Sequence, residues 1–135
     1  MAFFTLVIFQ IHRVFGEMIL PLLIVAAALY LTFTYKSDGP RSPVARIFPM
    51  LVDLQVSFGI LLWVLKLVTI PGGMALYLGF PFILHPILGL VAAGIAHMPT
   101  GIRNPLRSLG RWAPLASLAV LLLLVVGNAI LARRV

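Results

Sequence analysis

The chain contains no cysteine among its 135 residues. This absence excludes disulfide bonds, thiolate metal sites and iron–sulfur clusters ligated by this chain. Acidic residues are also scarce, because Asp and Glu number 3 against 10 Lys and Arg, which gives a formal net charge of +7. The basic residues stand at the ends of long apolar runs, where they face lipid phosphates. We therefore expect a lipid bilayer around this chain and no nucleic-acid partner.

Hydrophobic residues make up 62% of the chain and gather in four apolar runs. A soluble domain of this length could not bury so much apolar surface. Each run approaches the ~20 residues that a helix needs to cross the hydrocarbon core of a bilayer. The sequence therefore predicts an all-α fold, an integral membrane four-helix bundle that forms one domain over residues 1–135. The predicted helices cover residues 14–34, 47–68, 82–98 and 112–131.

The sequence does not fix the residue at which the first helix begins, because residues 3–9 are also apolar. A helix that included them would be longer than the hydrocarbon core is thick, so it would tilt, or its first turns would lie at the interface. The stretch from Arg13 to Ala28 has the charge, apolar core and small residues of a secretory signal. We expect that it is retained and forms a helix.

The basic residues between the runs predict the orientation in the membrane. The loops after the first and third runs carry six of them, Lys36, Arg41, Arg46, Arg103, Arg107 and Arg111. The other four are Arg13, Lys66, Arg133 and Arg134. Because cytoplasmic loops are richer in Lys and Arg, we expect both termini on the extracytoplasmic side of a multi-pass protein in the cell inner (cytoplasmic) membrane. The uncharged connector 70–81 is expected to lie in the interface or to pack against a partner protein.

Polar side chains inside the runs are the candidates for function, because their burial in lipid is costly. They are Gln10, His12, Arg13, Glu17, Asp53, Gln55, Lys66, His85 and His97. Arg13 and Glu17 are one helical turn apart and can neutralise each other, either as a simple interfacial anchor or as part of a polar network with Asp53 and His97. Asp53 is expected to be neutralised by His97 or by Arg46. Lys66 is expected to extend outward to the interface.

His12 and His85 are expected at similar depth, because each opens a run and the first and third helices run in the same direction. Two imidazoles at one level on separate helices of a bundle are what bis-axial haem ligation requires. Gly16 follows His12 by four residues, and Gly89 follows His85 by four residues, so each leaves a gap in the side chains beside a histidine. Gly59 leaves a further gap in the second run. We expect these gaps to admit a porphyrin beside its ligands. The alternative is that each imidazole only hydrogen-bonds to water near the head groups.

His97 follows His85 by twelve residues, which places it ~18 Å further along a helix and on a different face. It cannot bind the same iron. We expect a hydrogen-bonded structural role for His97, with a role as a ligand or in proton relay as the less favoured alternative.

Two motifs resemble a known family. Ile11-His12-Arg13 resembles the helix start of the haem A synthase family, and the segment 54–61, Leu-Gln-Val-Ser-Phe-Gly-Ile-Leu, resembles that family's Leu-Gln-x-x-x-Gly helix. An apolar connector and a helix that begins with His85 follow, so residues 10–98 are similar to one four-helix half of that family. Uncharacterised four-helix bacterial membrane proteins are similar too, with a His-Pro third helix and a histidine twelve residues later, as in His85-Pro86 and His97.

The resemblance implies a haem held by His12 and His85. It does not extend to oxidative chemistry, because haem A synthases contain two such halves and this chain contains one. Their catalytic half also has a glutamate just before its first histidine, whereas Gln10 stands before His12 in this chain.

These observations predict a small membrane subunit of a respiratory or photosynthetic electron-transfer complex, with one bis-histidine haem b and larger membrane subunits as partners. The alternative is a haem-free accessory subunit that stabilises a larger complex. A small transporter is less favoured, because no charge is clearly placed at the midplane. No catalytic constellation is visible, so we do not expect an enzyme. A quinone near Arg13, Glu17 and Lys66 has no support in the sequence.

Overall fold

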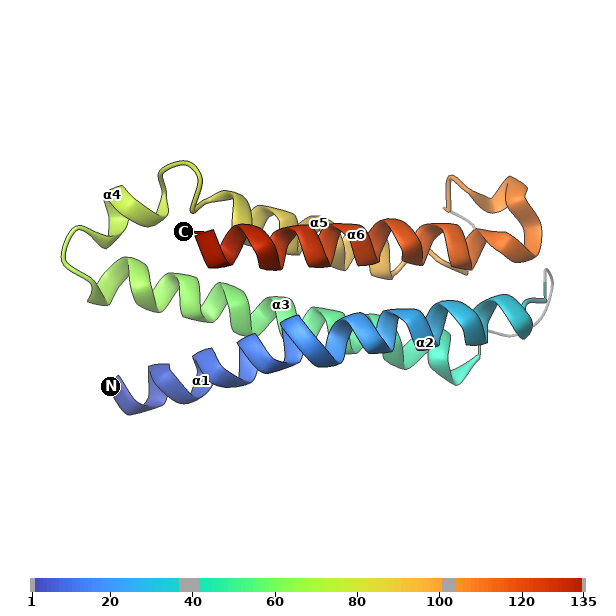
Figure 1. Cartoon of the computed structure of the whole chain (residues 1–135), viewed down its shortest axis with the longest axis horizontal. Helices are drawn as coiled ribbons and strands as arrows, with labels where there is room; N and C mark the ends of the chain where they lie inside the picture. The colour runs from blue at the N-terminus through green and yellow to red at the C-terminus, as the bar shows by residue number, and fades with distance from the viewer. Residues whose placement is uncertain (1, 37–41, 101–103, 135) are drawn as a thin grey trace.

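The computed structural model describes residues 2–36, 42–100 and 104–134, and all regular structure in these segments is helical. The elements are α1 (Ala2–Val14), the π-helical turn η1 (Phe15–Ile19), α2 (Leu20–Phe33), α3 (Pro43–Thr69), α4 (Gly73–Tyr77), α5 (Leu84–Ala96), the 3₁₀ helix η2 (Arg107–Trp112) and α6 (Ala113–Arg134). The long helices lie side by side, and both ends of the chain lie at the same end of the bundle (Figure 1).

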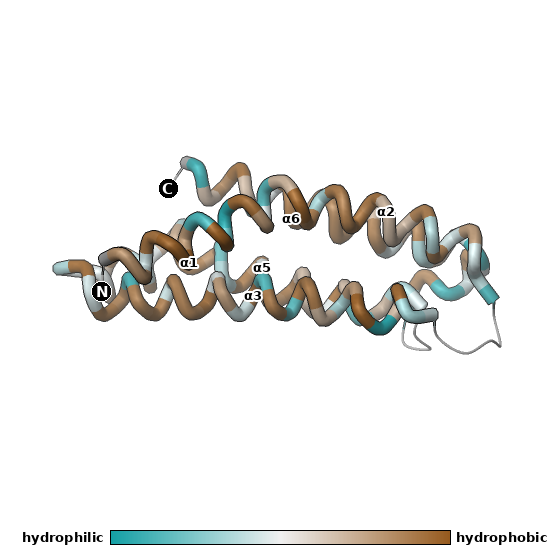
Figure 2. Tube along the Cα trace, turned by 90° about the horizontal axis from the view of Figure 1, so that it is seen from below, coloured by the Kyte–Doolittle hydropathy of each residue, from teal (hydrophilic) through white to brown (hydrophobic). Residues whose placement is uncertain are grey.

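The four main helices form a closed bundle. Helix α6 packs against α2 and α5, and α3 packs against the same two helices from the other side. Figure 2 shows this arrangement as two layers, with α2 and α6 in one and α3 and α5 in the other. Hydrophobic residues cover most of the length of these helices.

Among the described residues, three helices are long and apolar enough to cross a membrane, namely Phe3–Phe33, Pro43–Thr69 and Arg107–Arg133. The fourth, Leu84–Ala96, is apolar but shorter. Large apolar side chains on the long helices remain exposed, among them Leu22 (71%) and Leu123 (75%). Such surfaces are stable only under lipid or another protein. The prediction of an all-helical membrane protein is therefore supported.

The helices differ in extent from those predicted. The first helix begins at Ala2, twelve residues before the predicted start at residue 14. Helix α3 begins at Pro43, because the Ser42 Oγ accepts a hydrogen bond from the Ala45 amide (3.2 Å) and caps the helix. Pro49 therefore lies inside the helix. Helix α5 is shorter than the predicted 82–98. Arg41 and Arg103 of the predicted basic loops lie outside the described residues.

A π-helical turn interrupts the first long helix. The Leu20 amide donates to the Phe15 carbonyl, five residues earlier. We attribute the wide turn to Pro21, which has no N–H for the carbonyl four residues before it and whose ring would clash with that carbonyl. The turn carries Gly16 and Glu17, so the irregular part of the helix is also the part that faces the site described below.

The apolar core lies in the half of the bundle where α2 ends and α3 begins. Ile24 of α2, Val52 of α3 and Leu118 and Leu121 of α6 are almost fully buried. Ala96 of α5 is also fully buried. Its small side chain lets the helix approach its neighbours closely.

We expect Leu121→Ala to destabilise the bundle by about 2 kcal/mol or more, because it leaves a cavity at a fully buried position. Leu123→Ala is the matched control, since that side chain is exposed and 75% accessible. Thermal unfolding in detergent measures the difference. Equal losses in the two variants would contradict the packing described here.

Candidate functional site

A cavity of about 450 Å³ lies in the other half of the bundle, towards the chain ends. This volume falls in the range of small-molecule and cofactor sites, about 300–1,000 Å³. Its walls come from α1, η1, the first residue of α2, α3, α4, the connector before α5, α5 and α6. Apolar side chains such as Val56 and Leu62 line most of it, together with the aromatic rings of Phe9, Trp63 and Phe82.

His12 projects into this cavity from the last turn of α1 and forms a reciprocal pair with Gln55 of α3. The imidazole Nδ1 lies 3.2 Å from the backbone carbonyl oxygen of Gln55. In return, the buried Gln55 side chain donates from Nε2 to the backbone carbonyl of His12 at 2.7 Å. A carbonyl can only accept, so Nδ1 carries the proton and Nε2 keeps its lone pair.

His85 forms a second reciprocal pair, with Asn128 of α6. Its Nδ1 lies 2.9 Å from the amide oxygen Oδ1 of Asn128. The Asn128 Nδ2 donates to the backbone carbonyl of His85 at 3.1 Å, which fixes the orientation of the amide. The Nδ1 of His85 is therefore the donor, and its Nε2 is the free acceptor. In both histidines Nδ1 is hydrogen-bonded and Nε2 is left free.

The two imidazole rings lie together, as the depth argument from the sequence predicts. Their centroids are 6.0 Å apart and their planes are nearly perpendicular, at 88°. The rings do not point apart into lipid, because both line the cavity and both are only partly exposed.

Gly16 and Gly59 do not leave the open gaps that were expected to admit a porphyrin, because the Gln55 amide and the His12 ring occupy them. These two glycines instead make the hydrogen bonds of the His12–Gln55 pair possible. A Cβ on Gly59 would come within 2.7 Å of the His12 Cε1, and a Cβ on Gly16 would collide with the Gln55 amide. In a helix the residue at i+4 shields the carbonyl of residue i, so Gly16 opens the His12 carbonyl to Gln55 and Gly59 opens the Gln55 carbonyl to His12. Gly89 stands in the same position relative to the His85 carbonyl, and its nearest neighbour is Val56 at 3.8 Å.

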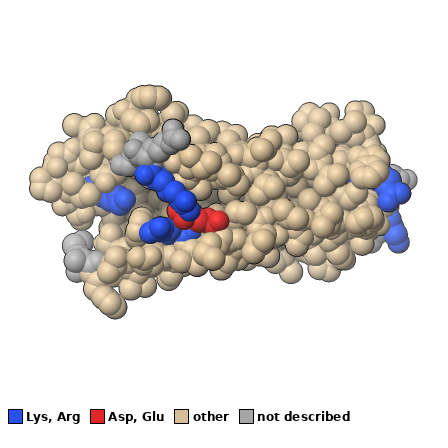
Figure 3. Space-filling view, viewed as in Figure 1, with Lys and Arg blue, Asp and Glu red and all other residues tan. Residues whose placement is uncertain are grey.

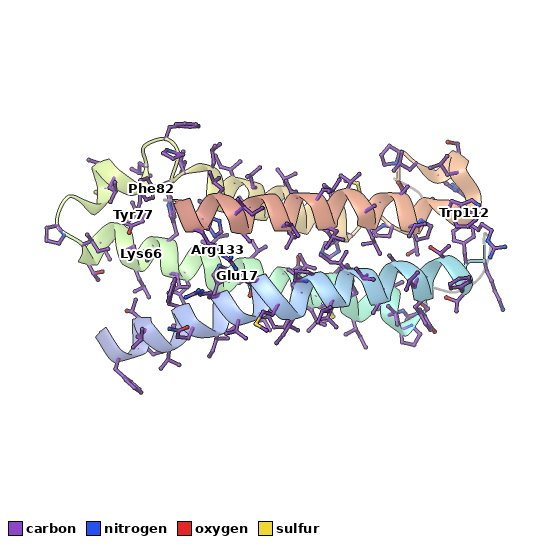
Figure 4. The ribbon with its side chains drawn as sticks, in the orientation of Figure 1. Glu17, Lys66, Tyr77, Phe82, Trp112 and Arg133 are labelled. Atoms are coloured by element: carbon purple, nitrogen blue, oxygen red, sulfur yellow. The ribbon has the colours of Figure 1, made fainter. Side chains whose placement is uncertain are left out.

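Charged side chains gather at one end of the cavity. The Arg133 Nη2 donates to Glu17 Oε2 at 2.6 Å, and the Arg13 Nε lies 3.6 Å from Glu17 Oε1. Figure 3 shows an acidic group enclosed by basic ones on this face, and Figure 4 shows Arg133 beside Glu17. The predicted pairing of Arg13 with Glu17 is thus present, with a second guanidinium added from α6.

Lys66 also lines the cavity, and its surroundings differ from the outward extension expected from the sequence. Its Nζ lies 5.3 Å from the ring centroid of Phe9 and 5.6 Å from that of Tyr77. The Trp63 indole donates to the Tyr77 carbonyl at 3.1 Å and so ties α4 to α3 beside the lysine. Figure 4 shows Lys66, Tyr77 and Phe82 at the same end of the bundle as Glu17.

The predicted polar network is divided into two separate pairs. Asp53 Oδ2 lies 2.9 Å from His97 Nε2, and this pair does not line the cavity. Both side chains are substantially exposed, at 44% and 54%. Of the two partners considered for Asp53, the structure therefore selects His97 over Arg46.

Sequence reasoning missed two contributions from α6. Asn128 holds His85, and Arg133 binds Glu17. The signal for Asn128 was available, because a lone amide inside a long apolar run is costly in lipid and needs a partner. Arg133 gave no such signal, since a basic residue at the end of a run usually marks the interface.

Comparison with protein-family models, curated proteins and solved structures finds no match for this chain. The function is therefore argued from the site.

We expect Gly59→Ala to lower the melting temperature in detergent, because the new Cβ must displace the His12 ring, an overpacking that costs about 1–3 kcal/mol. Gly94→Ala is the control in another helix, since nothing lies within 4 Å of its Cβ position. Alanine also has the higher helix propensity, so the control should be neutral or stabilising. A Gly59→Ala protein as stable as Gly94→Ala would show that the His12 ring is not held where described.

Proposed function

We propose that the protein is a small integral membrane subunit of a respiratory or photosynthetic electron-transfer complex and that it carries one haem b between His12 and His85. The observation that carries this proposal is the pair of imidazole rings, 6.0 Å apart, whose Nδ1 atoms are both engaged and whose Nε2 atoms are both free.

The ring spacing supports ligation of one metal by both histidines. A bond between a metal and an imidazole nitrogen measures about 2 Å, so two ligands on opposite sides place their nitrogens about 4 Å apart. Each ring centre lies beyond its nitrogen, which is compatible with centroids at 6.0 Å. Histidines that ligate metals usually donate the other ring N–H to an oxygen, which fixes their tautomer and orientation. Gln55 and Asn128 supply those oxygens.

The donor set favours a metal held by a macrocycle. Within the described part of the chain, no group of three or more His, Cys, Asp or Glu residues is placed to hold a metal ion. A porphyrin brings four nitrogens of its own and needs only two axial ligands. The apolar and aromatic walls of the cavity suit a flat apolar ring.

Haem iron with two axial imidazoles has no open coordination position, so the group supplies one-electron transfer. The chain's own residues would then perform three tasks. Gln55 and Asn128 hold the imidazoles in the tautomer that presents Nε2. The apolar walls exclude water. The bundle fixes the distance between α1 and α5, which carry the two ligands.

We further propose that α5 is a fourth membrane-crossing helix and that both termini are extracytoplasmic. The packing of α5 between α3 and α6 supports its place within the bundle. The end of α2, the start of α3 and η2, which carry or adjoin the basic residues Lys36, Arg46, Arg107 and Arg111, lie at the end opposite the termini (Figure 1). This supports an orientation with that end in the cytoplasm.

A haem-free accessory subunit is the second candidate, and the outer surface favours it. The uncharged connector exposes Met74 (64%) and Phe80 (81%), and Asp53 and His97 form an exposed polar pair on the outside of the bundle. Both features suit contact with larger membrane subunits. This candidate shares the partners of the first and differs only in lacking the cofactor.

We expect the protein, purified in detergent and reduced with dithionite after addition of haem, to show the absorption bands of a low-spin, six-coordinate haem b. His12→Ala and His85→Ala should each abolish that spectrum, because each removes one axial ligand. His97→Ala is the matched control and should leave the spectrum unchanged, since His97 lies outside the cavity. Absence of the bands from the unaltered protein would refute the haem and leave the accessory subunit as the function.

The absence of native cysteine allows a direct test of the orientation. We introduce single cysteines by Lys36→Cys and Met74→Cys, at opposite ends of the bundle and both at exposed positions. In intact cells an impermeant maleimide should label residue 74 and leave residue 36 unlabelled until the membrane is opened. The reverse pattern would contradict the proposed orientation.

A further inference from the structure

The side chains that line the cavity carry an excess of positive charge. Arg13, Lys66 and Arg133 contribute three positive charges and Glu17 one negative charge, so the lining has a net charge of +2 with both histidines neutral. Arg13 and Arg133 are 52% and 64% exposed, so their charges are in contact with the surroundings of the bundle. The excess of positive charge still attracts an anionic ligand to the cavity.

The three cations are not equivalent. Arg13 and Arg133 share the carboxylate of Glu17, at 3.6 Å and 2.6 Å. Lys66 has no ion pair with any described carboxylate. Its described contacts are the faces of Phe9 and Tyr77, beyond 5 Å from its Nζ. Aromatic faces attract a cation but accept no strong hydrogen bond, so the three N–H donors of the ammonium group are left for a ligand.

Lys66 lies where one end of a ligand bound between the histidines would be. It lies on α3 two turns beyond Gly59, which contacts the His12 ring, so it is displaced along the bundle from the imidazole pair by about 10 Å. The Trp63–Tyr77 hydrogen bond ties Tyr77, one of the two aromatic residues near the Lys66 ammonium group, to α3. His12 and His85 thus line one part of the cavity. Lys66, whose ammonium group has no ion pair with a described carboxylate, lines another part of the same cavity.

We propose that Lys66 binds a carboxylate of the cavity's ligand and that this ligand is a dianionic, flat, apolar molecule. The proposal rests on the proposed function and deepens it, because haem b carries two propionate groups. One propionate pairs with Lys66, and the second lies towards the guanidinium groups at Glu17. Lys66 is a positioning and binding residue, and it takes no part in iron ligation.

The experiment measures haem affinity in the full-length protein in a non-ionic detergent free of phospholipid. Ferric protoporphyrin IX and its dimethyl ester are titrated into the unaltered protein and into Lys66→Gln. We expect Lys66→Gln to weaken the affinity for the free acid about tenfold, the effect of losing one charge-assisted hydrogen bond. The affinity for the dimethyl ester, which has no carboxylate, should be the same in both proteins.

Two further variants control the measurement. Lys66→Arg keeps the charge and should retain most of the affinity for the free acid. Lys36→Gln removes an exposed lysine at the opposite end of the bundle and should change neither affinity. Equal affinity of Lys66→Gln and the unaltered protein for the free acid overturns the inference. So does an equal loss for acid and ester, because it shows a structural role for Lys66.

Two outcomes separate this inference from the haem proposal. A six-coordinate haem spectrum with affinity independent of Lys66 refutes the inference and leaves the haem in place. Metal-free protoporphyrin IX has both carboxylates and no iron. If it binds in a Lys66-dependent manner while haem gives no six-coordinate spectrum, the haem proposal fails and the inference stands. If Lys66→Gln weakens only adsorption to phosphatidylglycerol vesicles, the anion is a lipid phosphate and the inference is wrong.

Discussion

The site depends on a repeated interaction, in which an amide-bearing residue on one helix exchanges two hydrogen bonds with a histidine on another. Gln55 joins α3 to α1 through His12, and Asn128 joins α6 to α5 through His85. In an apolar bundle each such polar group is costly unless it is paired, so the two exchanges fix the positions and orientations of all four residues. Packing alone, between Leu and Val side chains, would leave the helices freer to slide.

The same constraint explains the division of the molecule into two halves. Where α2, α3 and α6 meet, Ile24, Val52 and Leu118 pack in an apolar core. Towards the chain ends, the π-helical turn, the reciprocal pairs and the aromatic residues of α3 and α4 surround a cavity. Irregular helix is tolerated within a bundle where its polar groups find partners or line a cavity. The other half also buries polar side chains, Thr32, Asn104 and Ser117, but these are hydrogen-bonded within α2 or around the start of α6 and line no comparable cavity.

Much of the fold could be predicted from the sequence. Long apolar runs, basic ends and breaks at Gly and Pro predict helices in a membrane, and the spacing of His12 and His85 predicts two rings at one depth. The helix starts were less accessible, because the cap at Ser42 and the long first helix depend on a few local contacts. The glycines four residues after each histidine were identified, but the contact of Gly16 with the Gln55 amide was not, because that amide comes from another helix.

The sequence by itself determined that the chain is apolar, helical and without thiol chemistry, since composition and periodicity are local properties. It also identified the histidine rings, the glycines and the basic residues as separate features of the chain. Only the tertiary structure decided which of them meet: Asn128 with His85, Arg133 with Glu17, and Lys66 with aromatic faces in place of a carboxylate. The physical reason is that partners more than forty or a hundred residues apart are set by helix packing and rotation, which residue spacing within one helix does not encode.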